Sequence, residues 1–169
     1  MSRARTLSDQ VLARWAPTVT GDVLSIGSQA DRDGGGKQYR AYFARARSYT
    51  TSEVSPGLGT DLVLDVRAMP AIPDASYDAV FCSGVLEHVD DCQAAVQECA
   101  RILRPGGLFL VGVPFQQRIH RAPQDFWRFT EHGIRYLLRA FAIEAIEAIG
   151  PDAKFPWTYW VCARKPEAA

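Results

Sequence analysis

The sequence lacks both long apolar runs and an excess of charge of one sign. No stretch approaches the ~18–20 consecutive apolar residues that a membrane-spanning helix needs, and no apolar core of a signal peptide follows the basic first ten residues. Lys and Arg total 19, and Asp and Glu also total 19, so no overall field attracts nucleic acid or an anionic membrane. We therefore expect a cytoplasmic protein with no nucleic-acid or membrane partner.

Cysteine is scarce and forms no recognisable pattern. The four cysteines make no Cys-x-x-Cys pair, and no His lies at zinc-finger spacing from them: Cys82, Cys92, Cys99 and Cys162. We expect buried thiols, no disulfide framework and no metal site. A reactive cysteine is the alternative, and it is disfavoured because nothing nearby in the sequence would lower a thiol pKa.

The length and composition fit one folded unit. A chain of 169 residues matches the prior of ~100–200 residues per domain. Apolar residues make up 47% and charged residues 22% of the chain, which is ordinary for a globular protein. We expect a single domain over residues 1–169.

Hydrophobic patterning alternates between strands and helices. The expected strands are residues 23–27, 48–54, 62–65, 77–83, 108–113 and 157–163. The expected helices are residues 8–16, a segment around 39–46, a segment capped by Asp90 or Asp91 and closed by Pro105, and a segment capped by Thr130. Residues 142–149 fit neither class, because their isoleucines recur every third residue. The alternation predicts an α/β domain with a doubly wound, mostly parallel sheet and helices on both faces.

The connection between the second and third strands is unusually short. Only residues 55–61 separate them, whereas a parallel crossover usually needs a dozen or more residues and a helix. We expect an extended connection without a helix there. The apolar sheet face left bare would then be covered by the leading helix, by the long loop after the first strand, or by a partner subunit in a homo-oligomer.

Polar and small residues gather at the ends of four expected strands. Gly27 ends the first strand, Glu53 the second and Asp65 the third, and Ser83 with Gly84 ends the fourth. In such a sheet the ligand binds beyond the carboxyl ends of the strands, at the point where the strand order reverses. Backbone N–H groups at a glycine loop and two carboxylates are what a nucleoside ligand requires. Each signal alone has a structural alternative, since a strand-terminal Asp is commonly a cap or turn residue.

Four segments in this order resemble one protein family. They are Asp65–Pro70 (DVRAMP), Pro73–Val80 (PDASYDAV), Val85–Val89 (VLEHV) and Arg101–Leu108 (RILRPGGL). The set is similar to that of class I S-adenosylmethionine-dependent methyltransferases, and the likeness extends over residues 22–140. The resemblance implies a seven-stranded Rossmann-like sheet, S-adenosyl-L-methionine as the cofactor and methyl transfer as the activity. The first loop departs from the family pattern, because Ser25 replaces the usual acid and the glycines are delayed to residues 34–36.

The resemblance also assigns positions to the cofactor. It places Gly27, Ser28 and Gln29 beside the methionine moiety; Glu53 and Val54 at the ribose; Asp65, Val66 and Arg67 at the adenine; and Ser83, Gly84 and His88 near the sulfonium. His88 also has a structural interpretation, because a His at a helix entry is commonly a packing or cap residue.

The segment from Pro114 to Thr130 is the most distinctive part of the sequence. It resembles the His, Pro, Asp, aromatic, Trp, Arg, aromatic, Thr signature of a bacterial methyltransferase subgroup. A loop leaving the fifth strand would overhang the methyl donor and form the substrate wall. His120 and Asp125 are therefore candidate proton acceptors, and three arginines are candidates for holding an anionic substrate: Arg118, Arg121 and Arg128.

A structural interpretation of this loop stays open beside the catalytic one. Asp125 and Arg128 are three residues apart and would pair to pin the loop, while Trp127 would fill the space beneath it. The three predicted catalytic residues are His120, Asp125 and Arg128.

Two classes of function follow from this pattern. The first is methyl transfer to a small-molecule acceptor, such as a hydroxyl or amine of a sugar or another metabolite. The second is a methyltransferase-like binding or scaffold protein whose altered first loop no longer supports turnover. A nicotinamide-dependent dehydrogenase is disfavoured, because the first loop lacks the Gly-x-Gly-x-x-Gly spacing. RNA binding is disfavoured by the zero net charge.

Overall fold

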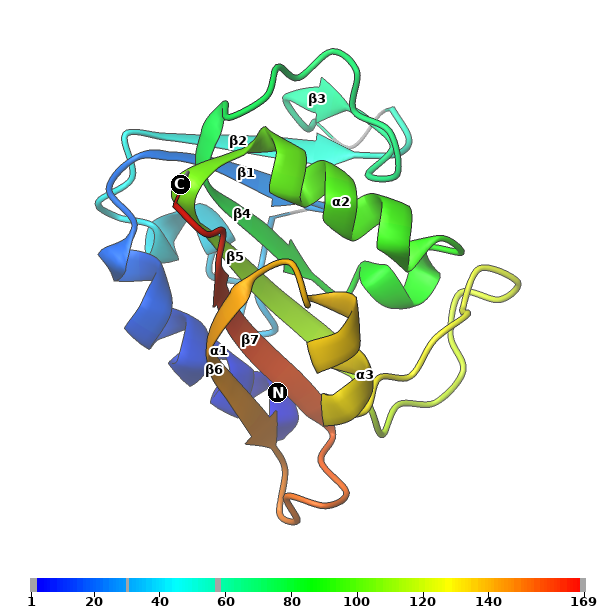
Figure 1. Cartoon of the computed structure of the whole chain (residues 1–169). Coiled ribbons are helices and arrows are strands. Elements are labelled where there is room, and N and C mark those ends of the chain that lie inside the picture. Colours follow the sequence, from blue (N-terminus) through cyan, green and yellow to red (C-terminus); the bar gives the residue numbers. More distant parts are fainter. Residues whose placement is uncertain (1–2, 30, 57–58, 168–169) are drawn as a thin grey trace.

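The computed structural model describes residues 3–29, 31–56 and 59–167. Seven strands form one sheet: β1 (Asp22–Ile26), β2 (Ser48–Glu53), β3 (Leu62–Val63), β4 (Tyr77–Ser83), β5 (Leu103–Pro114), β6 (Ala142–Ile149) and β7 (Thr158–Arg164). Their order across the sheet is β3-β2-β1-β4-β5-β7-β6 (Figure 1). The first five strands of that order are parallel, and β7 pairs antiparallel with both β5 and β6. The predicted doubly wound, mostly parallel sheet is confirmed.

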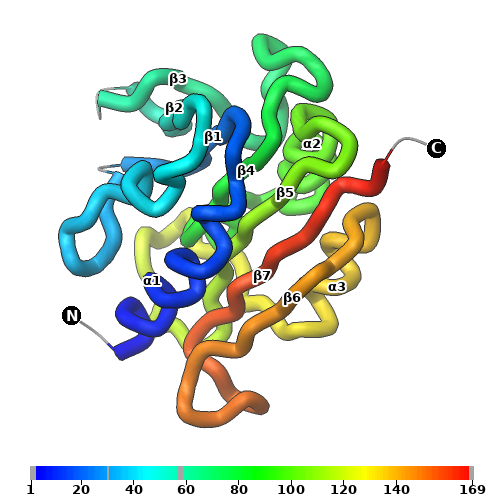
Figure 2. The backbone as a smooth tube through the Cα atoms, turned by 90° about the vertical axis from the view of Figure 1, so that its left-hand side faces the viewer, coloured from blue at the N-terminus to red at the C-terminus, as the bar shows by residue number. Residues whose placement is uncertain are grey.

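Helices lie on both faces of this sheet. On one face are α1 (Arg3–Trp15), η1 (Ala16–Thr18) and η2 (Tyr39–Tyr42). On the other are η3 (Leu86–His88), α2 (Cys92–Ile102) and α3 (Glu131–Leu137). Figure 2 shows α1 on the side of the sheet opposite to α2 and α3. Each face has its own apolar core, with Leu24 and Phe109 buried beneath α2 and α3, and Val23 and Phe81 buried on the α1 side.

Helix ends follow the capping residues that the sequence contains. The Asp91 side chain accepts a 2.9 Å hydrogen bond from the backbone N–H of Ala94, and the Thr130 hydroxyl accepts one from Gly133 at 3.1 Å. Both N-caps match the sequence predictions. The end of α2 differs from the prediction that Pro105 closes this helix. The helix ends at Ile102, and β5 begins with Leu103, before the Pro-Gly-Gly turn. A shift of register between Tyr77 and Ala79 accommodates that turn within the strand pair.

The prediction of a helix around residues 39–46 is wrong. The structure has only the four-residue η2 there. Asp33 accepts hydrogen bonds from the backbone N–H groups of Gly35 and Lys37, and the Tyr42 hydroxyl donates to it at 2.6 Å, so side-chain bonds hold the segment in a loop. The aromatic spacing reflects burial instead, because Tyr42 and Phe43 are buried against the α1 face.

The connection between β2 and β3 contains no helix in its described residues, as expected; residues 57 and 58 lie outside the described part. The long loop after β1 supplies cover for β2, because the Phe43 ring packs against Tyr49 with centroids 5.3 Å apart. Val63 on β3 stays 59% exposed. Cover by a partner subunit stays a prediction.

Residues 142–149 form a strand whose irregular pattern has a structural cause. The register of β6 against β7 shifts between Ile143 and Ala145. The extra residue puts Ile143 and Ile146 on the same face, whereas Ile149 belongs to the opposite core. A β-bulge therefore explains the three-residue spacing that suited neither a strand nor a helix.

The register brings the chemistry-bearing residues to one edge of the sheet. Ile26 pairs with both Ser52 and Cys82, and Glu53 pairs with Val63. The carboxyl ends of β1, β2, β3 and β4 therefore lie side by side. The segment between β5 and α3, yellow in Figure 1, lies beyond this edge.

Candidate functional site

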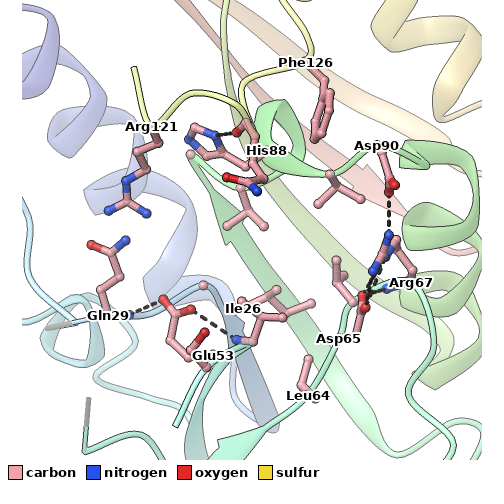
Figure 3. A pocket seen from close by; sticks show the side chains of 18 residues that line it. Ile26, Gln29, Glu53, Leu64, Asp65, Arg67, His88, Asp90, Arg121 and Phe126 are labelled. Carbon is pink, nitrogen blue, oxygen red and sulfur yellow. Dashed lines mark hydrogen bonds and ion pairs between the residues drawn. The ribbon is translucent and has the colours of Figure 1, made fainter. Parts of the chain in front are cut away.

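A cavity of about 530 Å³ opens at the carboxyl ends of the four parallel strands. Its volume lies within the ~300–1,000 Å³ range of small-molecule sites. It is lined by nine of the predicted cofactor residues: Gly27, Gln29, Glu53, Val54, Asp65, Val66, Arg67, Gly84 and His88. Glu53 and Asp65 thus face one common space (Figure 3). We call it the donor cavity.

Two glycines allow the backbone to approach this cavity closely. Gly27 and Gly84 both have a φ of +67°, in the left-handed region that favours glycine. A Cβ at Gly27 would lie 2.3 Å from Cγ2 of Val85, so a side chain there would collide with the wall of the cavity. Gly27 therefore keeps open the space at the end of β1.

Glu53 is held with its carboxylate toward the first loop. The backbone N–H of Gln29 donates to Oε1 at 2.9 Å, and the N–H of Val54 donates to Oε2 at 3.2 Å. The residue is only 9% exposed. Each carboxylate oxygen has a second lone pair, so Glu53 can still accept hydrogen bonds from a ligand in the cavity.

Asp65 is engaged by Arg67 on the opposite side of the cavity. The Arg67 guanidinium donates to the Asp65 carboxylate at 2.6–3.1 Å and reaches Asp90 at 2.6 Å (Figure 3). The hydrogen bonds from Arg67 lower the pKa of Asp65, and those to Asp65 and Asp90 raise the pKa of Arg67. The contact predicted between Asp65 and adenine stays a prediction, because Arg67 already occupies much of this carboxylate.

Two predicted cofactor residues lie outside the donor cavity. Ser28 is 7% exposed, and its hydroxyl bonds to the carbonyl and hydroxyl oxygens of Ser25 at 2.9 and 2.8 Å. It connects the first loop to β1 instead of facing a ligand. Ser83 lines the neighbouring cavity described below. The delayed glycines at 34–36 are likewise absent from the lining of the donor cavity.

A second cavity, of about 650 Å³, adjoins the first at Gly84, which lines both. Three of its aromatic lining residues come from η2, β7 and the loop before β7: Tyr39, Trp160 and Trp157. Its charged lining residues include one acid and one arginine from α1, Asp9 and Arg5, and one of each from the loop after β1, Asp33 and Arg32. We call it the acceptor cavity. Residues far apart in the chain build it, and sequence patterning did not predict that they meet.

Asp9 faces a second acid in this cavity. Burial, together with the charge of Asp33, raises the pKa of Asp9 from 3.8 to about 6. A polar molecule in this cavity would therefore meet a group that takes up a proton at mildly acidic pH.

The segment between β5 and α3 is pinned by Asp125 and Arg128. The guanidinium donates to both carboxylate oxygens of Asp125, at 2.6 and 2.9 Å, and to the carbonyl oxygens of three residues: Gln117, Arg118 and Trp127. These bonds use all five of its N–H donors. Arg128 lowers the pKa of Asp125, whose side chain is only 2% exposed. This geometry matches the structural interpretation of the pair, and their predicted part in catalysis stays a prediction.

His120 is oriented by the same pair and by the loop backbone. Its backbone N–H donates to Asp125 at 2.7 Å, and its Nδ1 lies 3.0 Å from the carbonyl oxygen of Arg118. A carbonyl only accepts, so Nδ1 carries the hydrogen and Nε2 keeps a free lone pair. Of the three predicted catalytic residues, His120 is the one that lines the acceptor cavity.

Sequence reasoning missed several residues around the two cavities. Phe126 and Arg121 from the distinctive loop line the donor cavity (Figure 3). Gln124 lines it as well. The loop was predicted to form a wall for the substrate, and Arg121 to hold that substrate. Glu87 lines the acceptor cavity and is 4% exposed. Burial raises the pKa of its carboxyl group. Glu87 belongs to the Val85–Val89 motif, yet a sequence motif does not reveal which of its members is buried.

The cysteines are free and buried, as expected. Burial raises the pKa of Cys92 and of Cys162 to about 12, which leaves them as thiols at neutral pH. Within residues 3–29, 31–56 and 59–167, no helix is long and apolar enough to cross a bilayer.

Comparison with known proteins shows which family the chain resembles. Residues 34–111 match the family described as "Methyltransferase domain". A probable S-adenosylmethionine-dependent methyltransferase of Mycolicibacterium smegmatis is 40% identical over 79 residues, which are 47% of this chain and 30% of that protein. Over these residues the chain is similar to S-adenosylmethionine-dependent methyltransferases, and the match spans just under half of the chain. The expected resemblance is thereby confirmed, and the methyl donor of this family is the cofactor that the resemblance implied.

Another relative is the ubiquinone biosynthesis O-methyltransferase of Xanthomonas oryzae pv. oryzae, 39% identical over 77 residues, or 46% of this chain and 30% of that protein. The aligned parts thus span under a third of both relatives.

Solved structures share the fold at lower identity. The N-methyltransferase NodS of Bradyrhizobium japonicum, solved with S-adenosylhomocysteine, has a TM-score of 0.74 at 17% identity, covering 98% of this chain and 89% of that chain. The [4+2]-cyclase SpnF has the same TM-score, 0.74, at 19% identity, covering 97% of this chain and 81% of that chain. One fold therefore supports more than one chemistry.

Proposed function

We propose that this protein is a methyltransferase that transfers the methyl group of S-adenosyl-L-methionine to a small-molecule acceptor, such as a hydroxyl or amine of a sugar or other metabolite. The observation that carries the proposal is the meeting of two cavities at Gly84, one lined by the residues expected to hold the donor and the other open to an acceptor. Methyl transfer is an in-line displacement, so it requires two adjacent compartments that hold both reactants in line.

The residues of the donor cavity fit the proposed cofactor. The space beside Gly27 is one that a Cβ would fill, and the buried Glu53 carboxylate can accept hydrogen bonds from ribose hydroxyls. When bound, S-adenosyl-L-methionine supplies an electrophilic methyl group on a sulfonium. Gly27 and Gln29 would lie at the methionine moiety, Glu53 and Val54 at the ribose, and Val66 at the adenine. His88 and Gly84 would lie toward the sulfonium.

The acceptor cavity supports a small, partly aromatic or polar acceptor. Trp157 and Trp160 offer apolar surface, and Asp9 and Asp33 offer hydrogen-bond acceptors. His120 is the candidate base, because its Nε2 lone pair is free while Nδ1 is tied to the backbone. An oxygen acceptor agrees with the name of one relative, an O-methyltransferase of ubiquinone biosynthesis.

Binding and turnover measurements test this proposal in two steps. We expect calorimetry to detect binding of both S-adenosylmethionine and S-adenosylhomocysteine. Glu53→Gln should weaken this binding, whereas the control variant Glu131→Gln on α3 should leave it unchanged. Formation of S-adenosylhomocysteine is then measured across a panel of small alcohols, phenols and amines. Absence of binding to either nucleoside would contradict the proposal and favour the alternative, a binding or scaffold protein without turnover. Binding without methyl transfer to any acceptor would point to another chemistry on this fold.

A further inference from the structure

Three potential metal ligands meet where the donor and acceptor cavities join. Glu87 and His88 lie in η3, directly after β4 and Gly84, and His120 comes from the loop after β5. One ligand atom from each residue lies within 4.8 Å of the others. The two imidazole rings pack edge to face, with centroids 4.8 Å apart. Zinc ligands lie ~2.0–2.2 Å from the ion, so small side-chain rotations would bring all three onto one ion.

Both histidines have the tautomer that a metal ligand needs. Nδ1 of His88 lies 2.5 Å from the carbonyl oxygen of Gln124, and Nδ1 of His120 lies 3.0 Å from that of Arg118. Each Nδ1 therefore carries a hydrogen, and each Nε2 has a free lone pair. In metal sites the non-ligating ring nitrogen is typically held in this way by a carbonyl or a carboxylate.

Glu87 supplies an independent sign that a ligand belongs here. The residue is 4% exposed, and among the described residues its Oε2 atom has no hydrogen-bond partner. Burying a carboxylate oxygen without a partner is costly, and a bound cation removes that cost. A purely structural glutamate would be expected to use both oxygens.

The backbone around the three residues is held in place. The Glu87 carbonyl oxygen accepts from the N–H groups of Phe126 and Trp127, at 2.7 and 3.3 Å. The Trp127 indole N–H donates to the carbonyl of Val89 at 2.7 Å. These bonds fasten the loop to η3, and the Asp125–Arg128 pair fixes the His120 end of the loop. The fixed backbone pre-organises a site that two distant segments share.

We propose that Glu87, His88 and His120 bind one divalent transition-metal ion of the zinc type, with an open position that faces the acceptor cavity. Two imidazoles and one carboxylate are a ligand set of catalytic zinc sites, whereas magnesium and calcium prefer oxygen ligands. This inference replaces the sequence-based expectation of no metal site. It rests on the proposed function for the role of the ion, because it makes the acceptor a molecule that bears a hydroxyl group.

The ion would activate the acceptor oxygen in place of a protein base. Coordination lowers the pKa of a bound hydroxyl, which releases its proton to solvent. A lone pair of the acceptor oxygen forms the new bond to the methyl carbon as the carbon–sulfur bond breaks, and the electron pair of that bond stays on sulfur. The products are a methyl ether and S-adenosylhomocysteine. In this arrangement His120 would be a ligand of the ion, which replaces its role as the candidate base in the metal-free mechanism.

Metal titration of the purified chain tests the site without any turnover assay. The protein is treated with EDTA, dialysed and titrated with zinc sulfate by calorimetry. In parallel, it is titrated with cobalt(II) chloride, with the visible d–d absorption as the readout. We expect one equivalent to bind, with binding weakened at least tenfold by Glu87→Gln, His88→Ala and His120→Ala. The matched control is His132→Ala, which removes the third His of the chain, on the exposed surface of α3.

The outcomes separate this inference from the proposed function. Zinc binding that is absent, or that is equally strong in all three ligand variants, overturns the metal site. Calorimetry with S-adenosylhomocysteine on the EDTA-treated parent, Glu87→Gln and His120→Ala samples reports on the donor cavity, which neither Glu87 nor His120 lines. Far-ultraviolet circular dichroism verifies that each variant, His88→Ala included, is folded. Failure of nucleoside binding with intact, variant-sensitive zinc binding would contradict the methyltransferase proposal and leave the metal site standing.

Discussion

The donor and acceptor cavities adjoin at Gly84, yet they are built in different ways. Successive strand ends of the parallel sheet form much of the donor cavity, with Gly27, Glu53 and Asp65 each directly at or after a strand. The acceptor cavity combines α1, η2, β7 and the loop after β5, which are far apart in the chain. The difference indicates that the donor side follows from the architecture of the sheet, whereas the acceptor side depends on packing particular to this protein.

Replacing His120 should have the largest effect and should separate the two cavities functionally. We expect His120→Ala to reduce the turnover number about 100-fold or more, since either a general base or a metal ligand is lost. The affinity for S-adenosylhomocysteine, measured by calorimetry, should stay within about twofold of that of the parent, because His120 does not line the donor cavity. A parallel loss of nucleoside affinity would contradict the separation.

Replacing Glu53 should produce the opposite pattern. Glu53→Gln keeps the size of the side chain and removes the charge, so hydrogen bonds to ribose hydroxyls become weaker. We expect the dissociation constant of S-adenosylhomocysteine to rise about tenfold, in line with the strength of hydrogen bonds to charged groups. At saturating donor, the KM for the acceptor should be unchanged. If nucleoside affinity is unchanged, Glu53 does not contact the ribose.

Arg128 should influence both cavities through the loop that it pins. Lysine keeps the charge but cannot donate five hydrogen bonds in the fork geometry, so Arg128→Lys should loosen the segment between β5 and α3. We expect the KM for the acceptor to rise several-fold and Tm to fall by a few degrees. Proteolysis followed by mass spectrometry should find new cleavage within residues 115–129. Arg121→Lys is the control, and equal effects of the two changes would argue against a special role for the Arg128 pair.

The smallest effect is expected from Asp9, and it should depend on pH. The folded-state pKa of Asp9 is raised from 3.8 to about 6, so the folded chain binds this proton more tightly than the unfolded chain does. The resulting cost to stability is absent below about pH 4, grows between pH 4 and 6, and is complete above pH 6. Asp9→Asn should therefore raise Tm slightly at pH 7.5 and leave it unchanged at pH 4. An equal rise in Tm at both pH values, or a similar rise in Tm for Asp152→Asn, would contradict the raised pKa of Asp9 as the cause.

Sequence patterning predicted the elements whose signals are local. The strand at residues 77–83 and the caps Asp91 and Thr130 agree with the structure because each depends on neighbours along the chain. The prediction of a helix around residues 39–46 failed, because the aromatic residues of this segment are buried in a loop and not on a helix. The β-bulge in β6 disrupted the alternation that would have marked residues 142–149 as a strand.

For the site, resemblance and strand ends predicted half of the residues that line the donor cavity. Of the predicted catalytic residues, they placed one, His120, at the acceptor cavity. The hydrogen bonds of Ser28 to Ser25 and the saturation of the Arg128 guanidinium could not be predicted, because hydrogen bonds compete for the same donors only after the chain has folded. The burial of Glu87 beside two imidazoles had no local signal either.

The sequence by itself determined the α/β architecture and placed Gly27, Glu53 and Asp65 at neighbouring strand ends. It could do so because parallel strands end at the same edge and because hydrophobic periodicity is a property of nearby residues. Only the tertiary structure decided that the loop after β5 folds back onto η3, so that His120 meets Glu87 and His88 between the two cavities. That contact depends on packing and on the satisfaction of polar groups over long sequence separations, which local patterns do not encode.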